Sequence, residues 1–260
     1  MGTAGKTNRP RGLATSDGLF DGKLQYQQPA GGFRTAVDSL ALSYICEVVS
    51  KPTPERVLDI GCGSGFLSLM AALLWPDAQV WGVDISDERI ACAKENVESN
   101  GMESRVKIHC ADVMERRYWP LTSCDLVVSN PPFYPLGSGT LPKDPSQAVA
   151  RFELSLNHEQ LAEVAGEAVK PGGMFVCMYP PERVSAVVEA AQNRGFSLRQ
   201  KYPIAATENQ TVFREVLVFV LEEKPSVEIQ PEPTLFLESK DGDLGPSLAS
   251  FVDRICQKLS

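Results

Sequence analysis

Residues 57–65 of this 260-residue chain are VLDIGCGSG, a short apolar run that ends in alternating glycines. The run predicts a buried strand, and the FLSLMAALLW that follows (66–75) predicts a helix. Gly61, Gly63 and Gly65 let the backbone turn tightly and approach a ligand at the helix N-terminus. A dinucleotide fingerprint would be GxGxxG, whereas the spacing here is GxGxG. Taken alone, the loop could equally be a plain strand-to-helix turn.

Apolar periodicity predicts strands that alternate with helices, which is typical of a parallel sheet covered on both faces. Strands are expected at 56–61, 79–85, 105–113, 124–130 and 174–180. Helices are expected at 36–49, 66–75, 86–101, 157–173, 182–195 and 247–259. The last strands, 197–205 and 214–223, have only a loop between them and predict an antiparallel hairpin. The predicted fold class is therefore α/β, a doubly wound, mostly parallel sheet of seven strands with an antiparallel edge hairpin.

The predicted domain organisation is a flexible tail over 1–22 followed by one domain over 23–260. The core of that domain is expected at about 33–222. Residues 224–260 are predicted to be a C-terminal extension, because their first part is rich in Pro, Gly and acids.

The composition, with 43% apolar and 22% charged residues, is ordinary for a globular protein. No apolar run approaches the roughly 20 residues that span a bilayer, and the N-terminus lacks the apolar core of a secretory signal. Seven cysteines without a CxxC pair predict reduced core thiols in a cytoplasmic protein, with neither disulfides nor a metal site. The net charge of −8 argues mildly against a nucleic-acid partner, although a local basic patch can suffice.

Acidic side chains mark the ends of three consecutive predicted strands, at Asp59, Asp84 and Asp112. An acid about 20 residues beyond such a glycine loop can accept hydrogen bonds from both hydroxyls of a ribose. Ile85 can offer an apolar face to a purine, and Asp112 can accept from its exocyclic amine. Asp84 alone could be an ordinary helix-capping acid. Together the acids indicate a nucleoside lying across the carboxyl edge of the sheet.

Residues 125–134 are DLVVSNPPFY, a predicted buried strand that runs into an amide, two prolines and two aromatic rings. The Asn130 side-chain oxygen and the Pro131 carbonyl can accept from the two N–H groups of an exocyclic amine. Such acceptors favour a pyramidal nitrogen whose lone pair faces an incoming electrophile. Both residues precede a proline and are held extended, and Phe133 or Tyr134 can stack on a base. The alternative is that the prolines only form a turn after the strand.

The motifs VLDIGCGSG, VWGVDIS, HCADV and LVVSNPPF resemble, in order and spacing, those of class I S-adenosylmethionine-dependent methyltransferases. The resemblance covers roughly residues 33–222 and implies an enzyme that uses S-adenosyl-L-methionine as its cofactor. The cofactor-binding residues that it implies are Asp59, Gly61, Gly63, Gly65, Asp84, Ile85, Asp112 and Asn130. The catalytic residues that it implies are Asn130, Pro131, Pro132 and Phe133. An Asn or Asp before two prolines and an aromatic residue marks methyltransferases that act on planar nitrogen.

Segments 25–45 and 148–161 resemble one bacterial branch, the tRNA (adenine-N6)-methyltransferases that act beside the anticodon of a valine tRNA. The resemblance implies an RNA substrate, and the expected substrate contacts are Phe133, Tyr134, Arg34 and Arg151. Phe133 replaces the commoner tyrosine, which keeps the stacking surface and loses a hydroxyl. The two arginines could meet phosphate or could equally be exposed or salt-bridged.

Three other functions stay open at this point. Glutamine N5 methylation of a release factor uses the same motif, but that family usually has a separate N-terminal helical domain. DNA adenine methylation normally requires a target-recognition domain, and residues 224–260 are few for that role. A non-catalytic scaffold would have no need of the Asn-Pro-Pro-Phe loop. A monomer or weak dimer is expected, without a membrane partner.

Overall fold

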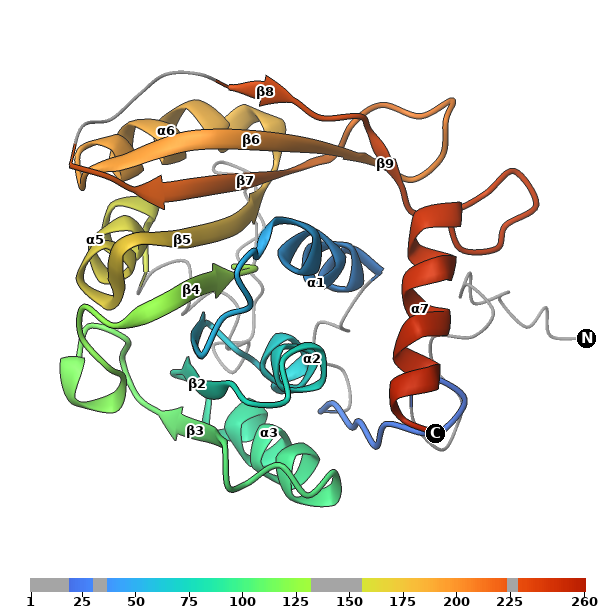
Figure 1. Cartoon of the computed structure of the whole chain (residues 1–260), viewed down its shortest axis with the longest axis horizontal. Coiled ribbons are helices and arrows are strands. Elements are labelled where there is room, and N and C mark those ends of the chain that lie inside the picture. The colour runs from blue at the N-terminus through green and yellow to red at the C-terminus, as the bar shows by residue number, and fades with distance from the viewer. Residues whose placement is uncertain (1–18, 30–36, 132–155, 224–228) are drawn as a thin grey trace, which may run out of the picture.

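The computed structural model describes residues 19–29, 37–131, 156–223 and 229–260 (Figure 1). Within them the α-helices are α1 (Val37–Val49), α2 (Phe66–Leu74), α3 (Asp87–Ser99), α5 (His158–Ala168), α6 (Val184–Gln192) and α7 (Pro246–Lys258). The strands are β1 (Arg56–Ile60), β2 (Gln79–Asp84), β3 (Val106–Cys110), β4 (Cys124–Ser129), β5 (Val169–Tyr179), β6 (Phe196–Ala205), β7 (Arg214–Leu221), β8 (Gln230–Pro231) and β9 (Leu235–Phe236). Short 3-10 helices cover η1 (Arg116–Tyr118) and η2 (Pro181–Arg183).

The described strands form a single sheet in the order β3-β2-β1-β4-β5-β7-β6-β8, with β9 also paired to β6. The strands from β3 to β5 are parallel, and β7 runs antiparallel to both β5 and β6. The predicted α/β class and the edge hairpin are confirmed. The sheet is larger than the predicted seven strands because residues of the C-terminal extension add β8 and β9 along β6.

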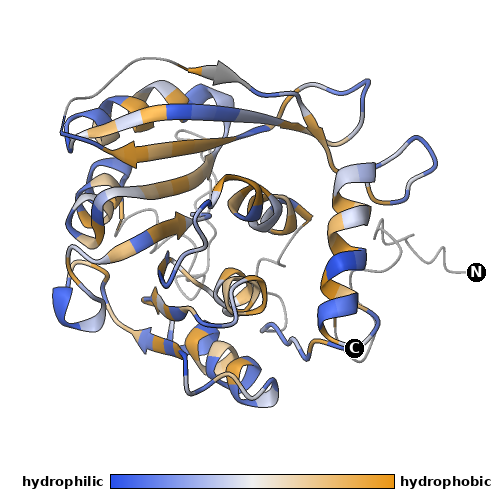
Figure 2. Cartoon of the chain, viewed as in Figure 1, coloured by the Kyte–Doolittle hydropathy of each residue, from blue (hydrophilic) through white to orange (hydrophobic). Residues whose placement is uncertain are grey.

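Helices cover both faces of the sheet, and successive strand residues alternate between the two cores, as the pleat of a strand requires. Val57 of β1 joins the core formed with α1, α2, α3 and α7. Leu58 and Ile60 of the same strand point to the other face and join the core formed with α5 and α6. The strands are therefore hydrophobic over much of their length, β7 in particular (Figure 2). Burial on both faces fixes the register of each parallel strand.

The boundary between α5 and β5 differs from the prediction, which continued the helix to residue 173. The helix ends at Ala168, and β5 begins at Val169, which pairs with Cys124 of β4. Lys170 forms an ion pair with Asp125 of β4 and holds this first part of the strand in place. Pro-Gly-Gly therefore lies within β5, at the irregularity between the Val169–Cys124 and Met174–Leu126 pairs.

The C-terminal helix α7 packs against α1 and α2 and lies beside the N-terminal part of the described chain (Figure 1). Phe251 is fully buried, and its ring meets Tyr44 of α1 edge-on with 5.6 Å between centroids. Lys23 donates from Nζ to the Cys256 carbonyl at 3.0 Å, near the C-terminus of α7. Phe20 is also fully buried, so Leu19 and Phe20 of the predicted tail contribute to the core. The division into a tail and one domain otherwise stays a prediction.

No helix in the described ranges is long and apolar enough to cross a membrane. The same residues contain no group of three or more His, Cys, Asp or Glu side chains arranged to hold a metal ion. All seven cysteines are described and are free thiols, and Cys46, Cys62, Cys124 and Cys177 are buried.

Truncating Phe251 tests whether the C-terminal extension unfolds together with the sheet. We expect Phe251→Ala to lower the free energy of unfolding by about 3 to 5 kcal/mol, as removal of a buried aromatic side chain usually does. Urea unfolding followed by circular dichroism should give one transition at a lower midpoint. Asp253→Ala, on the exposed face of α7, should leave the midpoint nearly unchanged. A wild-type midpoint for Phe251→Ala would show that α7 is not coupled to the core.

Candidate functional site

The glycine loop lies between the end of β1 and the start of α2 and is attached to β2 by its own backbone. Gly61 donates its N–H to the Val83 carbonyl at 2.8 Å, and Gly63 donates to Asp84 Oδ2 at 2.9 Å. Gly65, at the N-cap of α2, has a φ of 84°, in the left-handed region that favours glycine. A Cβ at Gly65 would also lie 3.2 Å from the Cβ of Ala93 in α3. The turn therefore depends on glycine.

Asn96 of α3 holds the outer side of this loop. Its side chain is 1% exposed and donates from Nδ2 to the Ser64 carbonyl at 2.9 Å. The same side chain bonds both the N–H and the carbonyl of Gln27. The Asn96 side-chain amide thus joins the segment at Gln27 to the glycine loop.

Asp59 lies beneath the loop with its side chain fully buried. Oδ2 accepts from the Ser68 hydroxyl at 2.6 Å, whereas Oδ1 is a buried oxygen with no donor among the described residues. Burial raises the pKa of Asp59 to about 7, and the nearby Asp84 charge adds to the shift. A carboxylate with one unmatched oxygen is prepared to accept from a donor that enters the site.

Asp84 ends β2 and is 4% exposed. Besides the bond from Gly63, its Oδ1 accepts from the Ser86 N–H at 2.8 Å. Burial raises its pKa above the usual range for aspartate, and these two backbone donors oppose that shift. Each carboxylate oxygen has a second lone pair, so the group can still accept from ligand hydroxyls.

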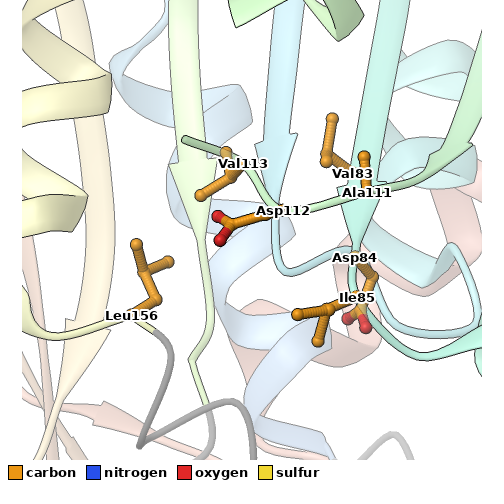
Figure 3. Close-up of a pocket in the computed structure, with 7 residues that line it drawn as sticks. All are labelled: Val83, Asp84, Ile85, Ala111, Asp112, Val113 and Leu156. Atoms are coloured by element: carbon orange, nitrogen blue, oxygen red, sulfur yellow. The ribbon is translucent and has the colours of Figure 1, made fainter. Parts of the chain in front are cut away.

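A small pocket opens beside Asp84 at the carboxyl edge of the sheet (Figure 3). Its walls are Val83, Asp84, Ile85, Ala111, Asp112, Val113 and Leu156. Of the three predicted acids, Asp84 and Asp112 line this pocket together with Ile85, whereas Asp59 is not among its walls. Ile85 is 38% exposed, which leaves an apolar surface open to a flat ring.

Asp112 lies in the turn after β3, two residues beyond the end of the strand. Its Oδ1 accepts from the Met114 N–H at 2.9 Å, which fixes the direction of the carboxylate. Arg116 ties this turn to α5 through Glu163 and Glu167, at 2.8 and 2.7 Å. The turn that carries Asp112 is thus held from both sides.

Asn130 and Pro131 come directly after β4, whose neighbour in the sheet is β1. Asn130 donates from Nδ2 to the Ser39 hydroxyl of α1 at 2.9 Å. The other predicted substrate or catalytic residues lie outside the described residues; they are Pro132, Phe133, Tyr134, Arg34 and Arg151. Their roles stay predictions.

The family model for the methyltransferase small domain matches residues 34–140. An Escherichia coli relative named tRNA1(Val) (adenine(37)-N6)-methyltransferase is 31% identical over 166 residues, which cover 64% of this chain and 67% of the relative. This chain belongs to the class I methyltransferases. Members of that class use S-adenosylmethionine as their methyl donor.

Solved structures share the fold of this methyltransferase. A predicted O-methyltransferase from Agrobacterium tumefaciens has a TM-score of 0.63 at 18% identity, covering 85% of this chain and 96% of its own. Pyrococcus horikoshii TYW2, solved in complex with MeSAdo, has a TM-score of 0.55 at 15% identity. The match covers 77% of this chain and 69% of the TYW2 chain.

Several residues of the methyltransferase site were not predicted from the sequence, among them Leu156 and Ser39. Leu156 forms a wall of the pocket but precedes α5, far along the chain from the other walls. Ser39 contacts Asn130 across 91 positions of sequence. The helical periodicity of 36–49 predicts that α1 forms, but not which of its residues meets the end of β4.

The raised pKa of Asp59 predicts a pH-dependent gain in stability when its charge is removed. A carboxyl whose folded-state pKa is raised stabilises the fold at low pH, and that contribution is lost as pH rises toward about 7. Asp59→Asn should therefore be more stable than wild type at pH 8 by a few kcal/mol, with the difference shrinking toward pH 5. Thermal unfolding of the ligand-free protein across this range measures it.

Asp77→Asn, at an exposed position, is the matched control and should show no such trend. A stability difference between Asp59→Asn and wild type that does not change with pH would mean that Asp59 is already ionised at pH 5.

Proposed function

We propose that this methyltransferase transfers a methyl group from S-adenosylmethionine to the exocyclic N6 amine of an adenine in tRNA. The observation that carries the proposal is Asn130 followed by Pro131 at the end of β4, the strand that pairs with β1 and so lies next to the strand that leads into the glycine loop. The printed activity of the 31% identical E. coli relative supports the choice of adenine and of tRNA.

The described residues fit the cofactor in donor and acceptor chemistry. Asp59 Oδ1 is a buried acceptor near the loop that an ammonium group would satisfy. Asp84 would accept from ribose hydroxyls, and Asp112 from the adenine amine, with Ile85 and Leu156 enclosing the ring. When bound, S-adenosylmethionine supplies an electrophilic methyl group on a sulfonium.

Asn130 and Pro131 act on the target amine. Its lone pair is delocalised into the ring, so the amine is a weak nucleophile until its nitrogen becomes pyramidal. Asn130 Oδ1 and the Pro131 carbonyl would accept from its two N–H groups and favour that geometry. Because these bonds are strongest as the nitrogen changes shape, they lower the barrier more than they raise ground-state affinity. Phe133 or Tyr134 would stack on the base, with Pro132 holding the loop extended.

The RNA surface must be local, because the chain has a net charge of −8. We place it along the N-terminal tail and segments 23–34 and 143–151, where Arg34 and Arg151 would meet phosphate. The Lys23 ammonium already donates to the Cys256 carbonyl of α7, so part of its hydrogen-bonding capacity is in use within the fold. A tRNA substrate places the enzyme in the cytoplasm.

Removing the Asp84 carboxylate should weaken cofactor binding. We expect Asp84→Ala to lower affinity for S-adenosylhomocysteine at least about tenfold, because the ribose hydroxyls lose their acceptor and Gly63 loses its tether. Isothermal titration calorimetry measures this. Glu88→Ala, exposed on the next helix, is the control and should bind normally. Equal affinity of Asp84→Ala and Glu88→Ala for the cofactor product would show that Asp84 does not contribute to the binding site.

Methylation of total tRNA with labelled cofactor, followed by digestion to nucleosides, tests the function directly. N6-methyladenosine is expected, and labelled protein or an unlabelled RNA fraction would overturn the proposal. Asn130→Ala should lower the single-turnover rate about a hundredfold or more while cofactor affinity stays near wild type. Near-normal turnover by Asn130→Ala would show that the Asn-Pro-Pro-Phe segment only forms a turn after the strand and has no catalytic role.

A further inference from the structure

Helix α3 presents two asparagine side chains, Asn96 and Asn100, to the segment near the start of the described chain. Gln27 donates its N–H to Asn96 Oδ1 at 2.7 Å, and its carbonyl accepts from Asn96 Nδ2 at 2.9 Å. Gln25 makes the same pair of bonds with Asn100, at 3.1 and 2.7 Å. Two residues of the segment are therefore bonded to α3 through both of their backbone polar groups.

The spacing of the two asparagines explains why the segment fits against α3. Residues four apart in a helix are separated by about 6 Å along its axis, and alternate residues of a strand are separated by about 6.6 Å. A side-chain amide also carries a donor and an acceptor, as a peptide group does. Asn96 and Asn100 thus act as the edge of a strand, with which residues 25–27 pair.

The two pairs differ in what else the asparagine holds. Asn96 Nδ2 also donates to the Ser64 carbonyl in the glycine loop, at 2.9 Å. Asn100 Nδ2 instead donates to the Asn96 carbonyl of its own helix, at 2.6 Å. Of the two pairs, the one at Gln27 is therefore attached to the glycine loop.

The orientation of the Asn96 amide is fixed by its partners. They are the Gln27 N–H and the carbonyls of Gln27 and Ser64, and a backbone group of each kind can only donate or only accept. A half-turn of the amide would set Oδ1 against two carbonyl oxygens and Nδ2 against an N–H. Because Asn96 is 1% exposed, water could not restore these bonds.

The Ser64 carbonyl belongs to the peptide group that leads into the left-handed turn at Gly65. The N–H of this peptide group, on Gly65, donates to the Cys62 carbonyl at 2.9 Å. With Asn96 in place, the peptide group is bonded at both ends. Without Asn96 its carbonyl end would be released, while the bonds from the loop to β2 would remain.

We infer that Asn96 is a positioning residue that couples the docking of residues 25–27 on α3 to the shape of the glycine loop. Cofactor binding and docking of the segment then stabilise each other by the same factor, as linkage requires. Tyr26, between the two paired residues, supports the docked position by packing its ring edge-on against Phe66 of α2, with 5.6 Å between centroids. The inference rests on the cofactor assignment of the proposed function and does not depend on the RNA substrate.

Calorimetry with S-adenosylhomocysteine tests the coupling from the side of the loop. Asn96→Ala should lower the affinity about tenfold, because the Ser64 carbonyl is no longer held. Asn100→Ala is the matched control, since it breaks the equivalent pair one turn along the helix without touching the loop, and it should change the affinity less than about twofold. Both variants are titrated below the onset of their thermal unfolding. Wild-type affinity of Asn96→Ala would overturn the inference and leave Asn96 an anchor of the segment alone.

Hydrogen exchange in the wild-type protein, followed by NMR at the Gln25 and Gln27 amides, tests the coupling from the side of the segment. The two amides are paired in the same way, so each is a reference for the other. Saturating S-adenosylhomocysteine should slow exchange at Gln27 about tenfold and at Gln25 less than about threefold. In Asn96→Ala the slowing at Gln27 should disappear. Equal slowing at both amides, or none at Gln27, would overturn the inference even if Asn96→Ala does not fold.

These outcomes separate the inference from the proposed function. If both responses appear while no RNA is methylated, the proposed reaction fails and the role of Asn96 stands. If tRNA is methylated while Asn96→Ala binds S-adenosylhomocysteine as wild type does, the proposed reaction stands and the inference fails. A wild-type protein that does not bind S-adenosylhomocysteine would overturn the cofactor assignment and the inference together.

Discussion

The site depends on one carboxylate, that of Asp84, which accepts a backbone N–H at each of its oxygens. Gly63 comes from the loop after β1, and Ser86 comes from the start of the connection to α3. The two loops are therefore fixed relative to each other by a side chain in addition to the backbone bond from Gly61 to Val83. Because the same oxygens are those proposed to receive a ribose, the residue that shapes the loop also recognises the ligand.

This arrangement buries the carboxyl groups of Asp59 and Asp84, where loss of hydration disfavours the charged form of each group. Asp59 is buried with one oxygen unmatched, and Asp84 lies close enough to raise the pKa of Asp59 further. Burying such groups lowers the stability of the ligand-free state, because a carboxylate without donors loses its hydration. A ligand with cationic and hydroxyl groups would return those hydrogen bonds. Donors from such a ligand would offset the cost of burying these carboxylates and would thereby contribute to its affinity.

Local sequence was sufficient to predict the features that lie at the ends of strands. The glycine spacing after residue 60, the acids at 59, 84 and 112, and the edge hairpin all follow from short motifs and periodicity. Local sequence was not sufficient to predict contacts between segments that are far apart in the chain. The start of β5 at Val169 depends on pairing with Cys124, and the Ser39–Asn130 bond depends on how α1 packs on β4. Leu156 lines the pocket from the segment before α5, a helix that Arg116 joins to the turn after β3. Such contacts are set by packing geometry, which no short motif encodes.

The bond from Lys23 to the last turn of α7 has a consequence for synthesis on the ribosome. Its partners are separated by 233 positions, so the bond cannot form until almost the whole chain has emerged. The segment after Lys23 is the one that Asn96 joins to the glycine loop through Gln27. Domains generally fold as units during synthesis, with N-terminal parts available first. The bond between the earliest and the latest described segments therefore forms last, so a chain released before α7 is made lacks this anchor of its N-terminal segment.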